Sequence, residues 1–229
     1  LNGDDDKLST VKTVNGKKPV FFGLDAKNDF YAKNIKNSGD GKVLATLCFD
    51  NNNIDVEIPA IGTYMVTNAL AAAAAGKLLG LTDEEIANGV ASYKTVGSRA
   101  NVINTGKIKI IDDCYNANPT SVRASLDTLS NLDGRKVAIL GDMKELGSEE
   151  LKLHFDTGVY AKSKDIGTVI TVGELAKELA KGADGKAFDT IEDAKSEILK
   201  TIKSGDVVLV KASHSMQFEN IVEFLKQNF

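Results

Sequence analysis

The sequence predicts an α/β fold whose C-terminal part is a Rossmann-like parallel sheet, preceded by a smaller part that mixes strands and helices. From residue 101 onward, short runs rich in β-branched residues alternate with stretches whose apolar residues recur at helical spacing. Such alternation is typical of a parallel sheet with right-handed crossovers. Before residue 95, apolar and polar residues instead alternate in strand-like runs that precede two helix patterns.

The N-terminal part is expected to contain three strands and two helices. Strands are predicted at residues 20–23, 42–49 and 54–58, with the turn cluster at residues 50–53 joining the last two into a hairpin. An Ala-rich run predicts a helix over residues 62–80, where Gly80 ends it. Thr82 and Glu85 have capping-box spacing, which predicts a second helix through about Tyr93.

The C-terminal part is expected to alternate strands with helices to the end of the chain. Strands are predicted at residues 108–111, 137–140, 168–172 and 207–210, with a weaker one at 187–188. Helices are predicted at residues 120–131, 149–162, 174–181, 191–203 and 216–227. The strand at 108–111 should be central, because Ile110 and Ile111 place apolar bulk on opposite faces.

The two parts meet at a predicted hinge. The segment at residues 95–100 reads Thr-Val-Gly-Ser-Arg-Ala and lies between a helix pattern and a new strand pattern. We therefore expect one domain over residues 1–97 and a second over residues 98–229.

Composition excludes several classes of function. Hydrophobic residues make up 42% and charged residues 26%, as in ordinary soluble globular proteins. A net charge of −4 gives no basic footprint for nucleic acid, and no apolar run is long enough for membrane insertion. The 2 cysteines form neither a disulfide framework nor a metal site, which fits a reducing cytoplasm. We expect a cytoplasmic monomer.

Polar residues gather directly after the strand at 108–111. Asp112 and Asp113 end that strand, and Tyr115, Asn116 and Asn118 crowd the following turn. Turns at the carboxyl ends of such strands are where ligands bind in open α/β sheets, and an acidic residue there can accept from ribose hydroxyls. The aspartates can equally be a solvated pair that bonds turn amides. Asn118 also suits a helix N-cap before a proline at the first helical position.

Other candidates have weaker support from the residues alone. Lys211 and Ser213 follow the last predicted strand, either as ligand contacts or as parts of a solvated loop. Arg99 suits phosphate oxygens, although a lone exposed arginine is ordinarily a solvated charge. His154 falls within a predicted helix, where a single histidine is more often structural. No Gly-x-Gly-x-x-Gly follows a strand, so a dinucleotide is not implied.

Three segments resemble motifs of the Mur ligases. Residues 112–121 read Asp-Asp-Cys-Tyr-Asn-Ala-Asn-Pro-Thr-Ser and closely resemble a signature of the branch that adds D-alanyl-D-alanine. Residues 134–147, which contain Gly-Asp-Met-Lys-Glu-Leu-Gly, resemble a second motif at the expected distance, and Val-Lys-Ala-Ser at residues 210–213 resembles a third. The resemblance runs along nearly the whole chain.

This resemblance implies a fold and an activity. Residues 1–97 would be the C-terminal portion of a central ATP-binding domain, and residues 98–229 a Mur ligase C-terminal domain. The complete enzyme would use ATP and Mg²⁺ to activate the peptide carboxylate of a UDP-N-acetylmuramoyl-tripeptide as an acyl phosphate. The amine of D-alanyl-D-alanine would then attack that acyl phosphate.

The resemblance also assigns residues to ligands. For ATP, the matching positions are Asn68, Arg99 and Asp113, at the adenine, the phosphates and the ribose respectively. For the other two substrates they are Tyr115, Asn116, Asn118, Lys211 and Ser213. The chain departs from the family pattern at Tyr64 and Met65, where His and Asn are usual, and at Ala212 and His214, where Gly and Arg are usual.

No Gly-x-x-x-x-Gly-Lys-[Ser/Thr] phosphate loop occurs in these 229 residues. In the Mur ligases that loop and the magnesium ligands lie upstream, so the chain is expected to begin within a domain and to be inactive alone. No catalytic residue or metal ligand is therefore assigned. Two alternatives remain open: a related ATP-dependent amino-acid ligase with a different incoming amine, and a non-catalytic α/β binding module.

Overall fold

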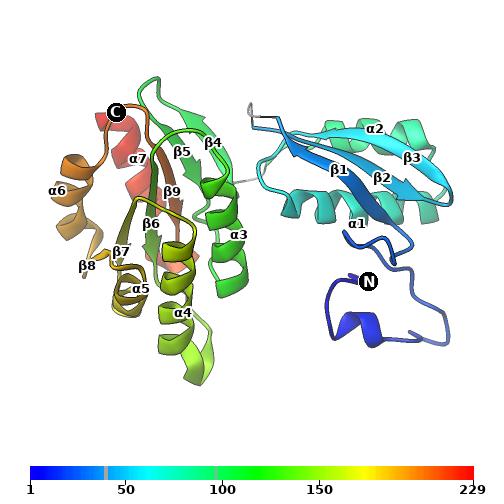
Figure 1. Ribbon diagram of the computed structural model, residues 1–229, viewed down its shortest axis with the longest axis horizontal. Coiled ribbons are helices and arrows are strands. Elements are labelled where there is room, and N and C mark those ends of the chain that lie inside the picture. The colour runs from blue at the N-terminus through cyan, green and yellow to red at the C-terminus, as the bar shows by residue number, and fades with distance from the viewer. Residues whose placement is uncertain (39–40, 96) are drawn as a thin grey trace. The chain divides into compact units, whose positions relative to one another are not determined.

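The computed structural model describes residues 1–38, 41–95 and 97–229, which form two compact units, Leu1–Lys94 and Thr95–Phe229. Each unit has its own elements and its own hydrophobic core (Figure 1). The predicted α/β class is confirmed. The predicted hinge at residues 95–100 includes Val96, which lies outside the described residues.

The first unit is a three-stranded antiparallel sheet with two helices. Its elements are the 3-10 turn η1 (Leu8–Thr10), strands β1 (Tyr31–Asn37), β2 (Val43–Phe49) and β3 (Asn52–Ile58), and helices α1 (Tyr64–Leu78) and α2 (Asp83–Ala91), with sheet order β1-β2-β3. The predicted hairpin of β2 and β3 is confirmed. Asp50 and Asn51 both have positive φ at its turn, as a tight turn between twisted strands requires.

Alternation along β3 places the core of this unit. Ile54, Val56 and Ile58 are buried, whereas Asp55 and Glu57 between them are exposed. The apolar face packs against the small residues of α1 and against α2. The capping box that starts α2 forms as predicted, with Thr82 and Glu85 bonding each other's backbone amides.

One predicted strand of this unit is wrong, and one observed strand was missed. Residues 20–23 form no strand, and only Phe22 pairs, in isolated bridges to Asn2 and Phe30. Strand β1 was not predicted, because it is a polar edge strand whose register shifts between Lys33 and Lys36, where Asn34 has a φ of 55°. Bulges and charges are typical of sheet edges and hide the period-2 pattern.

The second unit is a six-stranded sheet with helices on both faces (Figure 1). Its strands, in sheet order, are β4 (Asn101–Asn104), β5 (Lys109–Asp112), β9 (Val207–Lys211), β6 (Lys136–Gly141), β7 (Thr168–Val172) and β8 (Lys186–Phe188). Its helices are α3 (Pro119–Ser130), α4 (Glu150–Ser163), α5 (Ala176–Ala183), α6 (Ile191–Thr201) and α7 (Glu219–Asn228), with 3-10 turns η2 (Gly147–Glu149) and η3 (His214–Met216).

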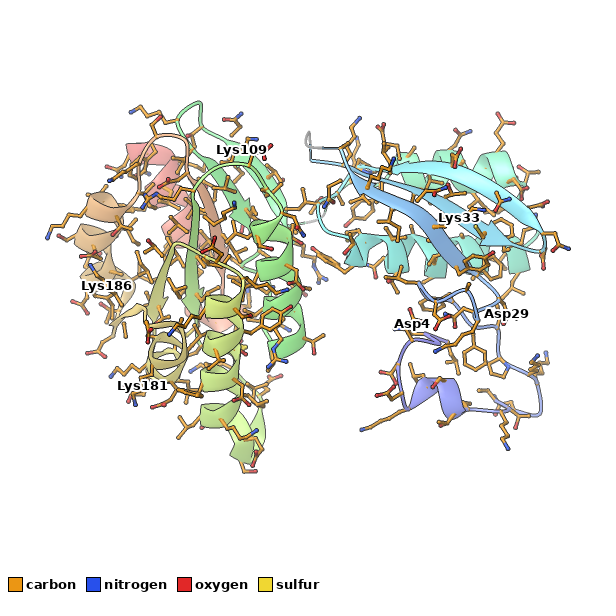
Figure 2. The ribbon with its side chains drawn as sticks, in the orientation of Figure 1. Asp4, Asp29, Lys33, Lys109, Lys181 and Lys186 are labelled. Carbon is orange, nitrogen blue, oxygen red and sulfur yellow. The ribbon has the colours of Figure 1, made fainter. Side chains whose placement is uncertain are left out.

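The core of this unit explains why its strands were predictable. Ile110 and Ile111 are both fully buried, one on each face, because the sheet is covered on both sides. Helices α6 and α7 cover the face that includes Ile110. Figure 2 shows Lys109 at the start of β5, where its side chain is exposed.

Two expectations for the sheet are corrected. The sheet is not wholly parallel, because β4 pairs antiparallel with β5. Strand β4 was not predicted, and a short turn in which Gly106 has a φ of 91° joins it to β5. Strand β5 is second in the sheet, and β9 lies nearer the middle. Strand β5 is still an interior strand, because the four-residue edge strand β4 pairs with one of its edges and β9 with the other.

His154 on α4 is a buried structural side chain. Its Nε2 accepts from the amide of Met143 at 2.9 Å, and its Nδ1 lies 2.7 Å from the carbonyl of Glu150. These partners place the single ring proton on Nδ1. His154 therefore fastens the segment after β6 to α4.

No helix in the described ranges is both long and apolar enough to cross a membrane.

The second unit is expected to fold alone, because the buried residues of its core all lie within residues 95–229. A piece covering these residues should show one cooperative thermal transition by circular dichroism or calorimetry. Non-cooperative melting of the isolated piece would contradict the prediction.

His154→Ala is expected to destabilise the chain by about 1–3 kcal/mol, because it leaves the buried amide of Met143 without an acceptor. His154→Gln keeps an oxygen near the position of Nε2 and should cost less. Urea unfolding of the second unit followed by circular dichroism measures both values. Equal losses would show that ring packing, and not the hydrogen bond, stabilises this site.

Candidate functional site

The carboxyl ends of β5 and β9 bring two charged side chains together. The strands are parallel neighbours, and Asp113 follows β5 while Lys211 ends β9. Lys211 Nζ lies 2.5 Å from Asp113 Oδ2. Both residues are buried, with relative exposures of 9% for Asp113 and 3% for Lys211. Residues 98 positions apart in the chain thus form a buried ion pair.

Further hydrogen bonds satisfy this ion pair. Asp113 Oδ2 also accepts from Ser125 Oγ at 2.7 Å, and Oδ1 accepts from the Ala100 amide at 3.1 Å. Lys211 Nζ also donates to the carbonyl of Asn116 at 2.9 Å. A carboxylate has about four acceptor sites, and Oδ1 has one protein partner, so Oδ1 can accept one further bond.

Asp112 and Cys114 stabilise the turn on the other side. Asp112 is buried, and its Oδ1 accepts from the Cys114 amide at 3.4 Å. Burial raises the pKa of the Cys114 thiol well above its usual range, and the neighbouring Asp112 carboxylate adds to the effect. Cys114 therefore stays a neutral thiol near pH 7 and is not a nucleophile.

Tyr115 is the exposed ring of this site. Its relative exposure is 47%, and the guanidinium carbon of Arg99 lies 3.6 Å from the ring centroid. The ring of His214, in the segment after β9, lies 6.0 Å away. Residues from three segments of the second unit thus meet at one aromatic side chain.

The two asparagines have different surroundings. Asn118 is the N-cap of α3, as predicted, because its Oδ1 accepts from the Ser121 amide at 2.8 Å and Ser121 Oγ accepts from the Asn118 amide. Asn116 Oδ1 accepts from the Ala117 amide at 2.8 Å. Both asparagines are exposed, so their amide NH₂ groups can reach a ligand.

Ser213 belongs to a second buried network, after β6 and β9. Its Oγ accepts from the Lys144 amide at 2.9 Å, and its own amide donates to the Asp142 carbonyl at 3.1 Å. The Asp142 carboxylate accepts from Lys144 Nζ at 2.7 Å and from the Ala176 amide at 2.8 Å. Ser213 is only 5% exposed, so its role here is to join two loops.

In the first unit, Asn68 lies on the exposed side of α1. It lines a groove of about 460 Å³ between α1 and α2, together with Met65 from α1 and Tyr93 just beyond α2. The other predicted site residues all lie in the second unit, where Arg99, Asp113, Tyr115, Asn116 and Lys211 form one connected cluster. Asn118 and Ser213 lie in the adjoining loops.

Sequence reasoning missed two members of this cluster. Ser125 was detectable, because it is a polar residue on the helix face that also carries Val122, Leu126 and Leu129. The Ala100 amide had no sequence signal, since a backbone donor depends only on the path of the chain. Within the described ranges, no three His, Cys, Asp or Glu side chains are arranged to hold a metal ion.

Family models match both units. The model of the Mur ligase middle domain matches residues 1–76, and the model of the Mur ligase glutamate ligase domain matches residues 98–214.

Curated relatives extend the match. A UDP-N-acetylmuramoyl-tripeptide–D-alanyl-D-alanine ligase of Bacillus subtilis is 33% identical, over 97% of this chain and 50% of the relative. The enzyme of the same name from Escherichia coli is 32% identical, over 100% of this chain and 52% of the relative. The chain thus spans about half the length of these relatives.

Solved structures agree with the sequence comparison. A MurF crystal structure from Acinetobacter baumannii matches 91% of this chain and 46% of its own, with a TM-score of 0.84 and 30% identity. MurF from Thermotoga maritima, in complex with ADP, matches 99% of this chain and 52% of its own, with a TM-score of 0.85 and 25% identity. Together with the two matching domain models, these similarities show that the chain belongs to the Mur ligase family.

Proposed function

We propose that this chain is part of an ATP-dependent ligase that joins D-alanyl-D-alanine to UDP-N-acetylmuramoyl-tripeptide. Relatives that match nearly the whole chain bear the name of that activity, and one similar structure holds ADP. The observation that carries the proposal is the cluster around Asp113 and Lys211, which lies where open α/β sheets bind ligands.

The nucleotide is assigned to three residues. Asn68 would pair with an adenine edge through its amide, and Arg99 would donate to phosphate oxygens. Asp113 Oδ1 would accept from one ribose hydroxyl, because Oδ2 is already used by Lys211 and Ser125. Asp113 would therefore contact the ribose through a single hydrogen bond.

The other two substrates are assigned to the exposed residues after β5. Tyr115, Asn116 and Asn118 present a ring and two amides that can both donate and accept, which suits peptide and carboxylate groups. Lys211 has one ammonium proton beyond its two protein partners and can donate it to a carboxylate. Ser213 would act indirectly, by holding the segment that carries His214.

In the proposed reaction, ATP phosphorylates the tripeptide carboxylate, and ADP leaves. The dipeptide amine then attacks the carbonyl carbon of the acyl phosphate, an amide bond forms, and inorganic phosphate leaves. We place the magnesium ligands outside this chain and assign none of its described residues to the metal.

We also propose that the domains divide between residues 97 and 98 and that the complete protein is a cytoplasmic monomer.

A different incoming amine is the second candidate. His214 stands where the family usually has an arginine, and its ring is exposed beside Tyr115. An imidazole binds a carboxylate more weakly than a guanidinium at neutral pH. A panel of amines that includes D-alanyl-D-alanine, D-alanine and L-lysine decides between the two candidates.

The complete protein that carries this chain is expected to release phosphate only when ATP, UDP-N-acetylmuramoyl-tripeptide and D-alanyl-D-alanine are all present. The 229 residues alone should release none, because they hold no phosphate loop. Coupled phosphate detection and mass spectrometry of the peptide product measure both. Product formed with another amine, but not with the dipeptide, would overturn the proposed substrate.

Asp113→Asn in the complete protein is expected to raise the ATP dissociation constant roughly tenfold, which corresponds to about 1.4 kcal/mol for one charge-assisted hydrogen bond. Asp112→Asn is the matched control, because its carboxylate bonds the Cys114 amide and is not assigned to ATP. Isothermal titration calorimetry gives the constants, and the melting temperature of each variant corrects for loss of the ion pair. Equal effects of the two substitutions would contradict the ribose assignment.

A further inference from the structure

The segment before β4 is fastened to the loop after β5 at two backbone points. The Ser98 carbonyl accepts from the Tyr115 amide at 2.9 Å, and the Ala100 amide donates to Asp113 Oδ1 at 3.1 Å. Ala100 has a φ of 53°, the left-handed conformation that costs energy for a residue with a Cβ. The contacts on both sides hold the backbone of Arg99 over this loop.

The side chain of Arg99 makes a cation–π contact with Tyr115. Its guanidinium carbon lies 3.6 Å from the ring centroid of Tyr115. A guanidinium directs its five N–H donors outward in its own plane, so stacking on a ring leaves those donors available. An ion pair with a carboxylate would occupy them. Among the described residues of the second unit, no oxygen accepts a hydrogen bond from Arg99.

We propose that Tyr115 is a positioning residue, which orients the guanidinium of Arg99 for the phosphate oxygens of ATP. The proposal rests on the proposed function, and it moves Tyr115 from a substrate contact to a support for a nucleotide contact. A stacked cation is worth about 0.5–1 kcal/mol at exposed sites and more when the pair is shielded from water. Its loss should therefore weaken nucleotide binding roughly two- to fivefold.

The stack itself is tested on the 229-residue chain, without nucleotide or turnover. The Hδ and Hε protons of Arg99 should resonate upfield in NMR spectra, because they lie above an aromatic ring. Tyr115→Phe keeps the ring and should keep the upfield shifts, whereas Tyr115→Leu should abolish them. Ordinary arginine shifts in the unsubstituted chain would overturn the proposal.

The positioning role is tested in the complete protein with the same two variants, and the constants compared are those for ATP. Tyr115→Leu should raise the KM for ATP and the dissociation constant of a non-hydrolysable ATP analogue roughly two- to fivefold, while the KM for D-alanyl-D-alanine stays unchanged. Tyr115→Phe keeps the ring under Arg99 and should restore the two ATP constants to those of the unsubstituted protein. Tyr160 also carries an arginine over its ring, Arg123 at 5.3 Å, so Tyr160→Leu is the control for losing such a contact elsewhere.

The outcomes separate this inference from the proposed function. An active enzyme in which Tyr115→Leu changes the dipeptide KM instead of the ATP constants would return Tyr115 to substrate contact and overturn the inference. Equal losses in Tyr115→Phe would assign the effect to the hydroxyl and overturn it too. If no ligation occurs, the proposed function fails, while binding of the ATP analogue still decides whether Tyr115 positions Arg99.

Discussion

The buried ion pair between Asp113 and Lys211 is the interaction on which the arrangement of this site depends. Removing two charges from water costs several kcal/mol per ion, and mutual attraction alone does not return that cost. Additional hydrogen bonds offset this cost. Ser125 and the Ala100 amide donate to the Asp113 carboxylate, and the Asn116 carbonyl accepts from the Lys211 ammonium. Because all these groups must meet at one place, the ion pair restricts the paths of the segments that carry them.

Four segments are fixed relative to one another by this pair. Ala100 precedes β4, Asn116 follows β5, Ser125 lies on α3, and Lys211 ends β9. A second carboxylate, Asp142, does the same for the segments after β6 and before α5. The carboxyl edge of the sheet is therefore stabilised by two ion pairs, in each of which a lysine neutralises a buried aspartate.

Physical reasons decide which parts of this fold could be predicted from the sequence. Strand β7 lies at the predicted residues 168–172, and both predicted helix caps, at Thr82 and Asn118, are present, because those signals are local. Strands β1 and β4 are polar edge strands, so their pairing depends on the neighbouring strand and not on their own pattern. The second unit is more regular, since sheets covered on both faces need long apolar runs.

The sequence singled out residues that the second unit brings together, apart from Asn68 in the first unit, but it did not show which of them are buried. The resemblance to family motifs assigned Asp113, Lys211 and Ser213 to ligands. All three side chains are buried and form hydrogen bonds within the protein. Arg99 and Tyr115 are exposed, and their mutual stacking involves residues from separate segments. Sequence motifs mark both kinds of residue alike, because a motif records neither burial nor partners. In this unit the buried charges define the frame, and Asp113 and Lys211 each keep one hydrogen-bonding position for a ligand, whereas the exposed ring, guanidinium and amides are openly available to one.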